Sequence, residues 1–194
     1  LMKAHRDLAN STEKMATGKR INHAADDAAN SGVSSNLNAQ RTGTRVAMRN
    51  IADGVSLLST MESTAGEIGQ KLKRMRELAV QGSSETLVMP ERKYLQAEMQ
   101  SLLDEVNRVA GGAEFNGLQF ADGSASSIDL QMGANNSTSD RMTLNFSDMT
   151  VAGIFGLTNQ PGVKTAGFAR SAIDTIDQAI DKVGGYRSAF GADQ

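Results

Sequence analysis

Apolar residues recur every three or four positions through much of the chain. Between about Arg41 and Gln81 they form one unbroken series with gaps of 4, 3, 3, 4, 3, 4, 3 and 4 residues. Its members are Ile51, Val55, Leu58, Met61, Ala65, Ile68, Leu72, Met75 and Ala79. Such a period, kept over about four heptads, is typical of a coiled-coil helix. At about 1.5 Å per residue this helix would be roughly 60 Å long, which predicts a rod.

A short break separates this helix from a second one. The segment QGSSETLVMPE places Gly82 near a helix C-terminus and Pro90 in the first turn of the next helix. The second apolar series ends before Gly111 and Gly112, and consists of Leu95, Met99, Leu102, Val106 and Val109. Because the loop is brief, we expect the two helices to be antiparallel neighbours.

Strand and turn patterns follow, and then the helical period returns. SIDLQMG and RMTLNFS, separated by ANNSTSD, predict a β-hairpin. After Pro161 the apolar positions are Phe168, Ala172, Ile176, Ala179, Ile180 and Val183. The fold class predicted is mainly α: an elongated rod of long antiparallel coiled-coil-like helices with a small β-hairpin region at one end. We expect the two chain ends to lie side by side at the other end.

Composition excludes several kinds of function. None of the 194 residues is Cys or Trp, so disulfides and thiolate chemistry are excluded. The formal net charge is −2, from 20 basic and 22 acidic residues, which argues against nucleic acid or an anionic membrane as a partner. No apolar run approaches the roughly 20 residues that span a bilayer. Since the chain starts with Leu1 and has no signal-peptide pattern, we expect it to begin inside a longer sequence.

One segment, RINHAADDAAN, has the spacing of a metal site. His23 lies three and four positions before Asp26 and Asp27, which would put all three on one helix face. The alternative is a helix start, where carboxylates accept hydrogen bonds from free N–H groups and suit the positive end of the dipole. The only other histidine, His5, is 18 residues away, which favours the helix start. Without a nucleophile–base pair or phosphate-binding motif, we expect no enzymatic activity, cofactor or metal.

Two rows of like charge follow the helical period. One is basic and one acidic, formed by Arg41, Arg45 and Arg49 and by Asp174, Asp177 and Asp181. Either both rows are solvated helix faces, or they meet, within one subunit or between neighbours in an assembly. Exposed ion pairs contribute only about 0–1 kcal/mol each but can set the register of two surfaces. The six residues are therefore candidate subunit contacts.

Long blocks of the chain resemble bacterial flagellin. These blocks are LANSTEKMATGKRINHAADDAAN, NIADGVSLLSTMESTAGEIGQKLKRMRELAVQ, QAEMQSLLDEVNRVAGGAEFNGLQFADG and AIDTIDQAIDKVGGYRSAFGADQ. The chain departs from the family where Asn30 and Ser31 stand before Gly32, since flagellins usually have Gly directly after A-A-D-D-A-A. We expect it to lack the family's extreme terminal segments and large variable outer domain, so that it resembles a minimal flagellin trimmed at both ends. The hook–filament junction protein is the nearest alternative, although NRVAGGAEFNG favours flagellin.

The resemblance implies a structural subunit that self-assembles outside the cell into the flagellar filament for swimming motility. It also implies an export chaperone and a cap protein as partners. Residues 1–30 would be the end of an inner-core helix and a connector, 31–113 the N-terminal rod helices, 114–163 the hairpin and loop region, and 164–194 the C-terminal rod helix. We expect the trimmed chain to fold but not to polymerise by itself. A secreted helical adhesin or binding module is the competing class.

The resemblance further implies recognition by the host's flagellin-sensing Toll-like receptor. The family's receptor-contacting arginine and leucine in the RxRELAVQ block match Arg74 and Leu78, and the glutamate of the QAE block matches Glu98. Residues four apart share a helix face, and Glu98 would lie on the antiparallel neighbour. The alternative is that Arg74 is a solvated charge and Leu78 continues the core series.

Overall fold

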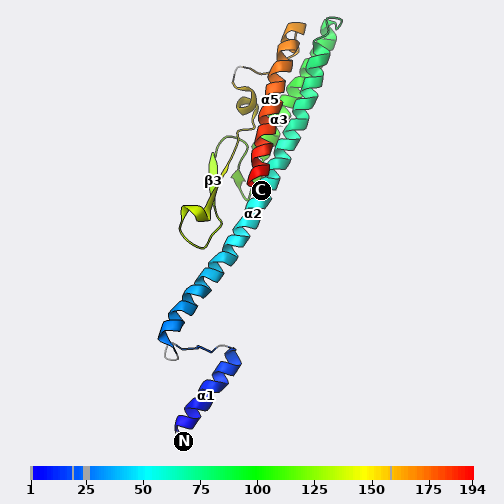
Figure 1. Cartoon of the computed structure of the whole chain (residues 1–194). Helices are drawn as coiled ribbons and strands as arrows, with labels where there is room; N and C mark the ends of the chain where they lie inside the picture. Colours follow the sequence, from blue (N-terminus) through cyan, green and yellow to red (C-terminus); the bar gives the residue numbers. More distant parts are fainter. Residues whose placement is uncertain (1, 19, 24–26, 158) are drawn as a thin grey trace.

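The computed structural model describes residues 2–18, 20–23, 27–157 and 159–194. The helices of this part are α1 (Met2–Thr17), α2 (Ala28–Gly82), α3 (Met89–Gly112), α4 (Val151–Phe155) and α5 (Ala166–Asp193), with a 3-10 turn, η1, at Thr138–Asp140. The strands are β1 (Glu114–Phe115), β2 (Leu118–Gln119), β3 (Ser127–Gln131) and β4 (Arg141–Asn145). Together they form one elongated molecule along α2 (Figure 1).

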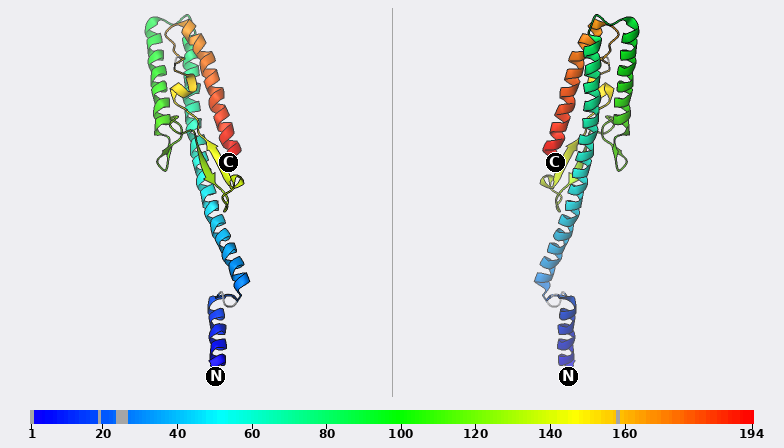
Figure 2. Two further views of the ribbon diagram at one scale, coloured as in Figure 1. Left: turned by 90° about the vertical axis from the view of Figure 1, so that its left-hand side faces the viewer. Right: turned by 90° about the vertical axis from the view of Figure 1, so that its right-hand side faces the viewer.

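Helix α2 is the axis of the rod. Its 55 residues correspond to a length of about 80 Å. Helices α3 and α5 both run antiparallel to its C-terminal part and form a three-helix bundle with it (Figures 1 and 2). The α2–α3 loop closes one end of this bundle, and the β region lies at its other end. Beyond the β region α2 continues alone towards α1. The predicted fold class, a mainly α rod with a small β-hairpin region, is confirmed.

The expectation that the chain ends lie side by side is wrong. Gln194 Nε2 donates to Ser59 Oγ at 3.1 Å, so the C-terminus lies beside the middle of α2. Helix α1 lies beyond the N-terminal end of α2, far from the C-terminus (Figure 1). The cause is the route of the chain after β4, which returns along the bundle so that α5 starts near the α2–α3 loop. There Arg170 Nη2 donates to Glu85 Oε1 at 2.8 Å.

The core lies where the three long helices meet. Most of the expected α2 series is buried: Leu58, Met61, Ala65, Ile68, Leu72, Met75 and Ala79. Ile51 and Val55 are 37% exposed because they lie near the end of the bundle. In α3 the buried residue is Leu103, whereas the expected Leu102 is only partly buried. In α5, Phe168 is exposed instead of buried.

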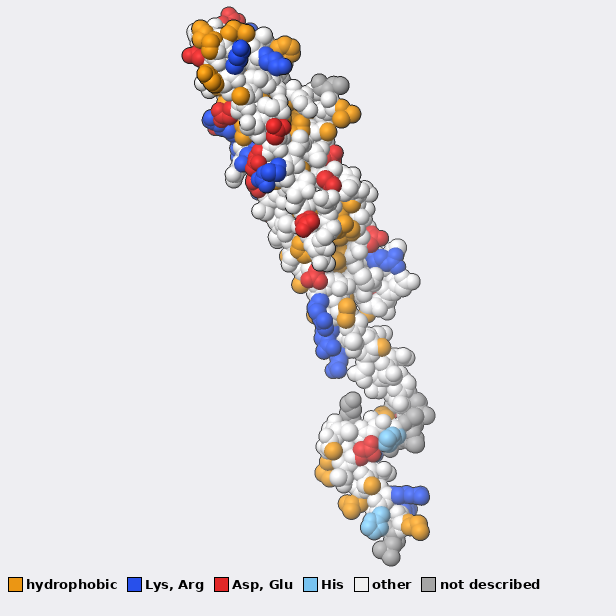
Figure 3. Space-filling model, turned by 180° about the vertical axis from the view of Figure 1, so that it is seen from behind, with side chains coloured by type: hydrophobic (Ala, Val, Ile, Leu, Met, Phe, Trp, Pro, Cys, Tyr) orange, Lys and Arg blue, Asp and Glu red, His pale blue; other side chains and the backbone are white. Residues whose placement is uncertain are grey.

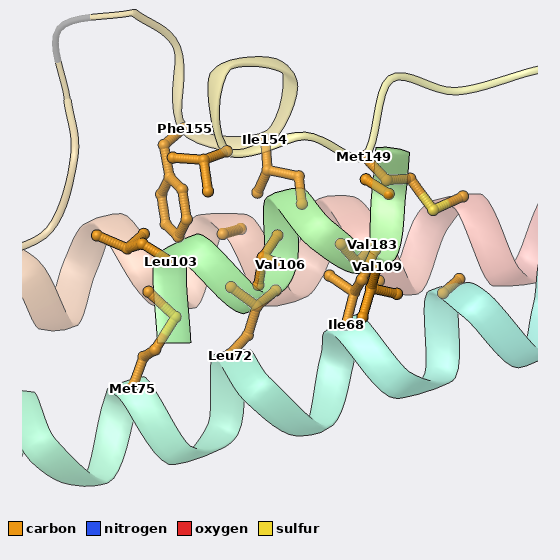
Figure 4. Close-up of a cluster of buried hydrophobic side chains, with 14 of the residues drawn as sticks. Ile68, Leu72, Met75, Leu103, Val106, Val109, Met149, Ile154, Phe155 and Val183 are labelled. Carbon is orange, nitrogen blue, oxygen red and sulfur yellow. The ribbon is translucent and has the colours of Figure 1, made fainter. Parts of the chain in front are cut away.

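Helix α4 and Met149, which precedes its N-cap Thr150, cover one side of the core. Figure 4 shows Ile154 and Phe155 pointing towards Leu103 and Val106 of α3. Thr150 caps α4 by accepting a hydrogen bond from the Gly153 N–H at 3.1 Å. The helical period did not predict this element, since five residues are too few to show a period.

Helix α2 begins at Ala28, earlier than the apolar series indicates. Asp27 is its N-cap, with Oδ1 accepting from the Asn30 N–H at 3.1 Å, which confirms the helix-start interpretation of RINHAADDAAN. His23 Nε2 lies 2.9 Å from Glu13 Oε1 of α1. Asp26, the third residue of the metal hypothesis, lies outside the described residues. The apolar series does not extend to the first turns of α2, because the side chains described there are mostly exposed.

Two small hairpins form the β region. Strands β3 and β4 pair antiparallel, with Ser127 opposite Asn145 and Gln131 opposite Arg141, which confirms the predicted hairpin. Strands β1 and β2 are joined by Asn116 and Gly117, whose φ angles of 51° and 80° suit a two-residue turn. Asn-Gly is a strong sequence signal for such a turn, so this hairpin was predictable from FNGL.

Two glycines of α2 are expected to respond oppositely to alanine. A Cβ on Gly66 would meet nothing within 4 Å, whereas a Cβ on Gly82 would lie 2.9 Å from Val163 Cβ. Gly66→Ala should therefore raise the free energy of unfolding by about 0.5–1 kcal/mol, through better helix propensity. Gly82→Ala should lower it, because the branched Val163 side chain cannot easily move away. Urea unfolding followed by circular dichroism measures both, and equal effects would contradict the packing at Val163.

Candidate assembly and receptor surfaces

Arg74 and Glu98 lie together on the surface between α2 and α3. Arg74 Nε donates to Glu98 Oε1 at 2.8 Å, and its Nη1 donates to Glu77 Oε2 at 2.9 Å. The hydrogen bonds with Glu77 and then with Glu98 raise the pKa of the Arg74 guanidinium above its usual value. The Arg74 and Glu98 side chains are 50% and 43% exposed, so both can be reached from solvent. The antiparallel packing of α2 and α3 thus brings two of the three candidate receptor residues together.

Leu78 does not share this surface. It is 1% exposed and belongs to the bundle core beside Met75 and Ala79. Two helical positions four apart differ by about 40° around the axis, which here separates the solvent face from the core face. The expectation of an exposed face shared by Arg74 and Leu78 is therefore wrong, and Leu78 continues the core series.

The basic and acidic rows do not meet within one chain. Arg41, Arg45 and Arg49 are exposed on the part of α2 outside the bundle and form no ion pair with any residue that the structure describes. Figure 3 shows basic side chains gathered along this part of the helix. Asp177 instead pairs with Arg76, at 2.6 Å between Oδ1 and Nε. Arg45 lies 31 residues from Arg76 on the same helix, or about 45 Å away.

Ion pairs also connect the helices along the outside of the bundle. Arg187 contacts Glu62 at 3.1 Å across α2 and α5, and Lys71 contacts Glu105 at 3.7 Å across α2 and α3. Arg108, with which Glu105 also pairs, is the main cause that lowers the pKa of Glu105 to about 2. Sequence reasoning missed the two pairs between helices, because their partners lie 34 and 125 residues apart and no local spacing indicates them.

The surfaces described so far consist of exposed charged side chains on the long helices. In the ranges that the structure describes, no three His, Cys, Asp or Glu side chains are grouped so that they could hold a metal ion. Nor does any helix there have the length and apolar character needed to cross a membrane. The long helices, the two charge rows and exposed apolar side chains such as Leu8 of α1 and Leu37 of α2 are features of a rod-shaped structural protein.

Comparisons with known proteins identify its family. Residues 1–126 match the family model of the bacterial flagellin N-terminal helical region. The chain is 36% identical to a flagellin of Halalkalibacterium halodurans over 200 aligned residues, which cover all of this chain and 73% of that protein. The chain belongs to the flagellin family. It spans 48% and 47% of the longer flagellins of Clostridium tyrobutyricum and Vibrio cholerae.

Solved structures agree with this assignment. The crystal structure of Bacillus cereus flagellin matches with a TM-score of 0.64 at 32% identity, covering 75% of this chain and 82% of that one. The proposed flagellar hook-associated protein of Vibrio parahaemolyticus matches with a TM-score of 0.69 over 88% of both chains, but at 16% identity. The second likeness shows the fold alone. The sequence identity therefore supports flagellin.

Proposed function

We propose that this chain is a repeating structural subunit of the bacterial flagellar filament, outside the cell, and that it serves swimming motility without any catalytic role. The similarity to a flagellin along the whole chain carries the proposal. Exposed apolar side chains on α1 and the free part of α2 support it: Met2, Leu8, Met15, Val33, Leu37 and Met48. A soluble rod gains free energy when neighbouring copies cover such surface. An export chaperone and a cap protein complete the proposed partners.

Electron microscopy of the complete natural protein tests this function. We expect filaments from the unaltered protein, and a higher critical concentration for Leu37→Asp, by at least about tenfold. The reason is that burying one leucine contributes roughly 1.5–3 kcal/mol, and 1.4 kcal/mol corresponds to a factor of ten. Asn36→Asp is the matched control, since it adds the same charge one residue away. A protein that stays monomeric under every condition would contradict the proposal and favour a helical binding module.

We also infer that the exposed surface around Arg74 and Glu98 contacts the host's flagellin-sensing Toll-like receptor. Two observations support this: the two residues match the family's receptor-contacting positions, and they form one accessible ion pair. Leu78 cannot contribute by direct contact in this conformation, because it is buried. Arginine is favoured in interface hot spots, so Arg74 is the residue on which the inference depends.

Changing Arg74 to Ala is expected to weaken binding to the soluble receptor ectodomain by roughly thirtyfold, or about 2 kcal/mol. Surface plasmon resonance with the folded chain measures the affinity. Arg76→Ala is the matched control, since Arg76 lies on the same helix, is 47% exposed and also pairs with a carboxylate. Equal affinities of the Arg74 and Arg76 variants would remove the basis for the receptor surface.

A further inference from the structure

The basic row, defined as Arg41, Arg45 and Arg49, forms no ion pair with any residue that the structure describes, although Asp53 lies one turn beyond Arg49. Residues 28–52 contain these three arginines and no acidic residue. The β3–β4 hairpin contacts the same stretch of α2, where Asn50 Nδ2 donates to Gln131 O at 3.0 Å. At about 100° per residue, Asn50 and the buried Ala47 lie on the side of the helix roughly opposite the basic row. The hairpin therefore leaves the basic row open to solvent.

The acidic row, defined as Asp174, Asp177 and Asp181, is its counterpart on α5. Residues 171–181 contain these three aspartates and no basic residue. The core-facing residues Ala172 and Ile176 lie on the other side of α5. Asp174 and Asp181 form no ion pair with any residue in the described ranges, and only Asp177 is engaged, with Arg76. Asp174 and Asp181 are exposed and remain open to solvent, while Asp177 contacts Arg76 of the same subunit.

The two rows match in length. The basic row extends over nine residues and the acidic row over eight, or about 12 and 10.5 Å between the first and last residue along their helix axes. We propose that the basic row of one copy docks on the acidic row of a second copy, displaced by about 45 Å along the rod. This inference rests on the proposed filament function and names one of its subunit contacts. The displacement follows from the separation of Arg45 and Arg76 on α2, since Arg76 marks the level of Asp177.

Such a contact produces an open polymer. It joins two different surfaces and relates the copies by a translation, so a docked pair keeps the acidic row of one copy and the basic row of the other free to bind further copies. Heterologous contacts that do not close into a ring build filaments. Each exposed pair contributes little free energy, about 0–1 kcal/mol, but opposite rows of charge select one register and disfavour others. The contact should weaken as salt increases, because the charges are exposed.

A cysteine cross-link tests the contact directly, because none of the 194 residues is a cysteine that could react as well. Thr42 lies three positions before Arg45, and Gln178 lies between Asp174 and Asp181, all on exposed helix faces. Within one copy, Thr42 is 34 residues from the level of Arg76, or about 50 Å from Gln178. A short bismaleimide cannot bridge that distance, but it can bridge two helices in contact, whose axes lie about 8–10 Å apart. We expect assembled filaments of the T42C/Q178C variant to give a ladder of covalent oligomers in denaturing gels.

The matched control is T42C/Q100C, because Gln100 is exposed at a similar level of the bundle but on α3. A ladder from T42C/Q178C and none from T42C/Q100C supports the contact. Filaments without a ladder from T42C/Q178C, or with a ladder only from the control pair, overturn the contact and leave the filament function standing. If the unaltered complete protein forms no filaments, the filament function itself fails, and the contact fails with it.

Charge reversal gives a second readout. Asp174→Lys with Asp181→Lys should raise the critical concentration for assembly by about tenfold, and Arg41→Glu with Arg45→Glu in the same chain should restore it. All four residues are exposed, so the melting curves of the variants should stay close to that of the unaltered protein. Loss without restoration would show that the two rows do not face each other.

Discussion

Replacing Leu72 by alanine is expected to lower the free energy of unfolding by about 3 kcal/mol. Leu72 is fully buried on α2 and points to the space between α2 and α3, close to Met75 and Val106 (Figure 4). Leucine-to-alanine changes in protein cores cost about 2–5 kcal/mol, since the lost transfer free energy adds to the cost of the cavity. The narrow bundle contains few side chains at each level, so little repacking can fill the space.

Urea unfolding of the chain, followed by circular dichroism at 222 nm, measures this loss. Leu37→Ala is the matched control, because Leu37 lies on the same helix and is 59% exposed. Its effect should stay within about 0.5 kcal/mol under conditions where the chain is monomeric. A loss of the same size at both positions would mean that the bundle around Leu72 is not packed as described.

The long helices were predictable because their burial repeats with the helical period. Where one helix face meets two neighbours, from Leu58 to Ala79, every expected position is buried. The prediction was less accurate where two adjacent residues are both apolar, because the helical period alone does not show which of them is buried. Leu102 and Leu103 are equally apolar, and the packing of α4 on α3 decides that Leu103 is buried. The first turns of α2 have no neighbour in the bundle, so no apolar series indicates them.

The sequence predicts which residues share each candidate surface, but not which residues they contact. The period of four shows that Arg41, Arg45 and Arg49 share one face, but it does not show which residues face them. Arg76 and Asp177 are 101 residues apart and meet only because the chain returns along the bundle before α5. Such pairings depend on where the loops lead the chain. Loop sequences show no hydrophobic period, so they do not predict this route. The burial of Leu78 likewise depends on the angle at which the helices pack.

Arg92 is a further residue that the sequence pattern does not distinguish from its neighbours. It is 7% exposed, whereas the adjacent Lys93 is exposed. Its Nη1 donates to Gly82 O at 2.5 Å and its Nη2 to Ser84 O at 2.6 Å. Gly82 is the last residue of α2, where the helix dipole is negative and the last carbonyls have no partner within the helix, and Ser84 lies in the loop that follows. The fork of the guanidinium therefore joins the start of α3 to the end of α2.

Arg92→Met is expected to lower the free energy of unfolding by about 2 kcal/mol. The methionine keeps much of the apolar stem, but it leaves two carbonyl oxygens without their donors, and an unsatisfied buried group costs about 1–3 kcal/mol. Part of this cost is relieved because water can reach Ser84, which is exposed. Arg92→Lys should recover only part of the loss, since one ammonium group lacks the rigid fork that spans both oxygens. Lys93→Met is the matched control and should change the unfolding free energy by less than about 0.5 kcal/mol. If Arg92→Met and Lys93→Met were equally stable in urea unfolding, the two hydrogen bonds would not hold the α2–α3 junction together.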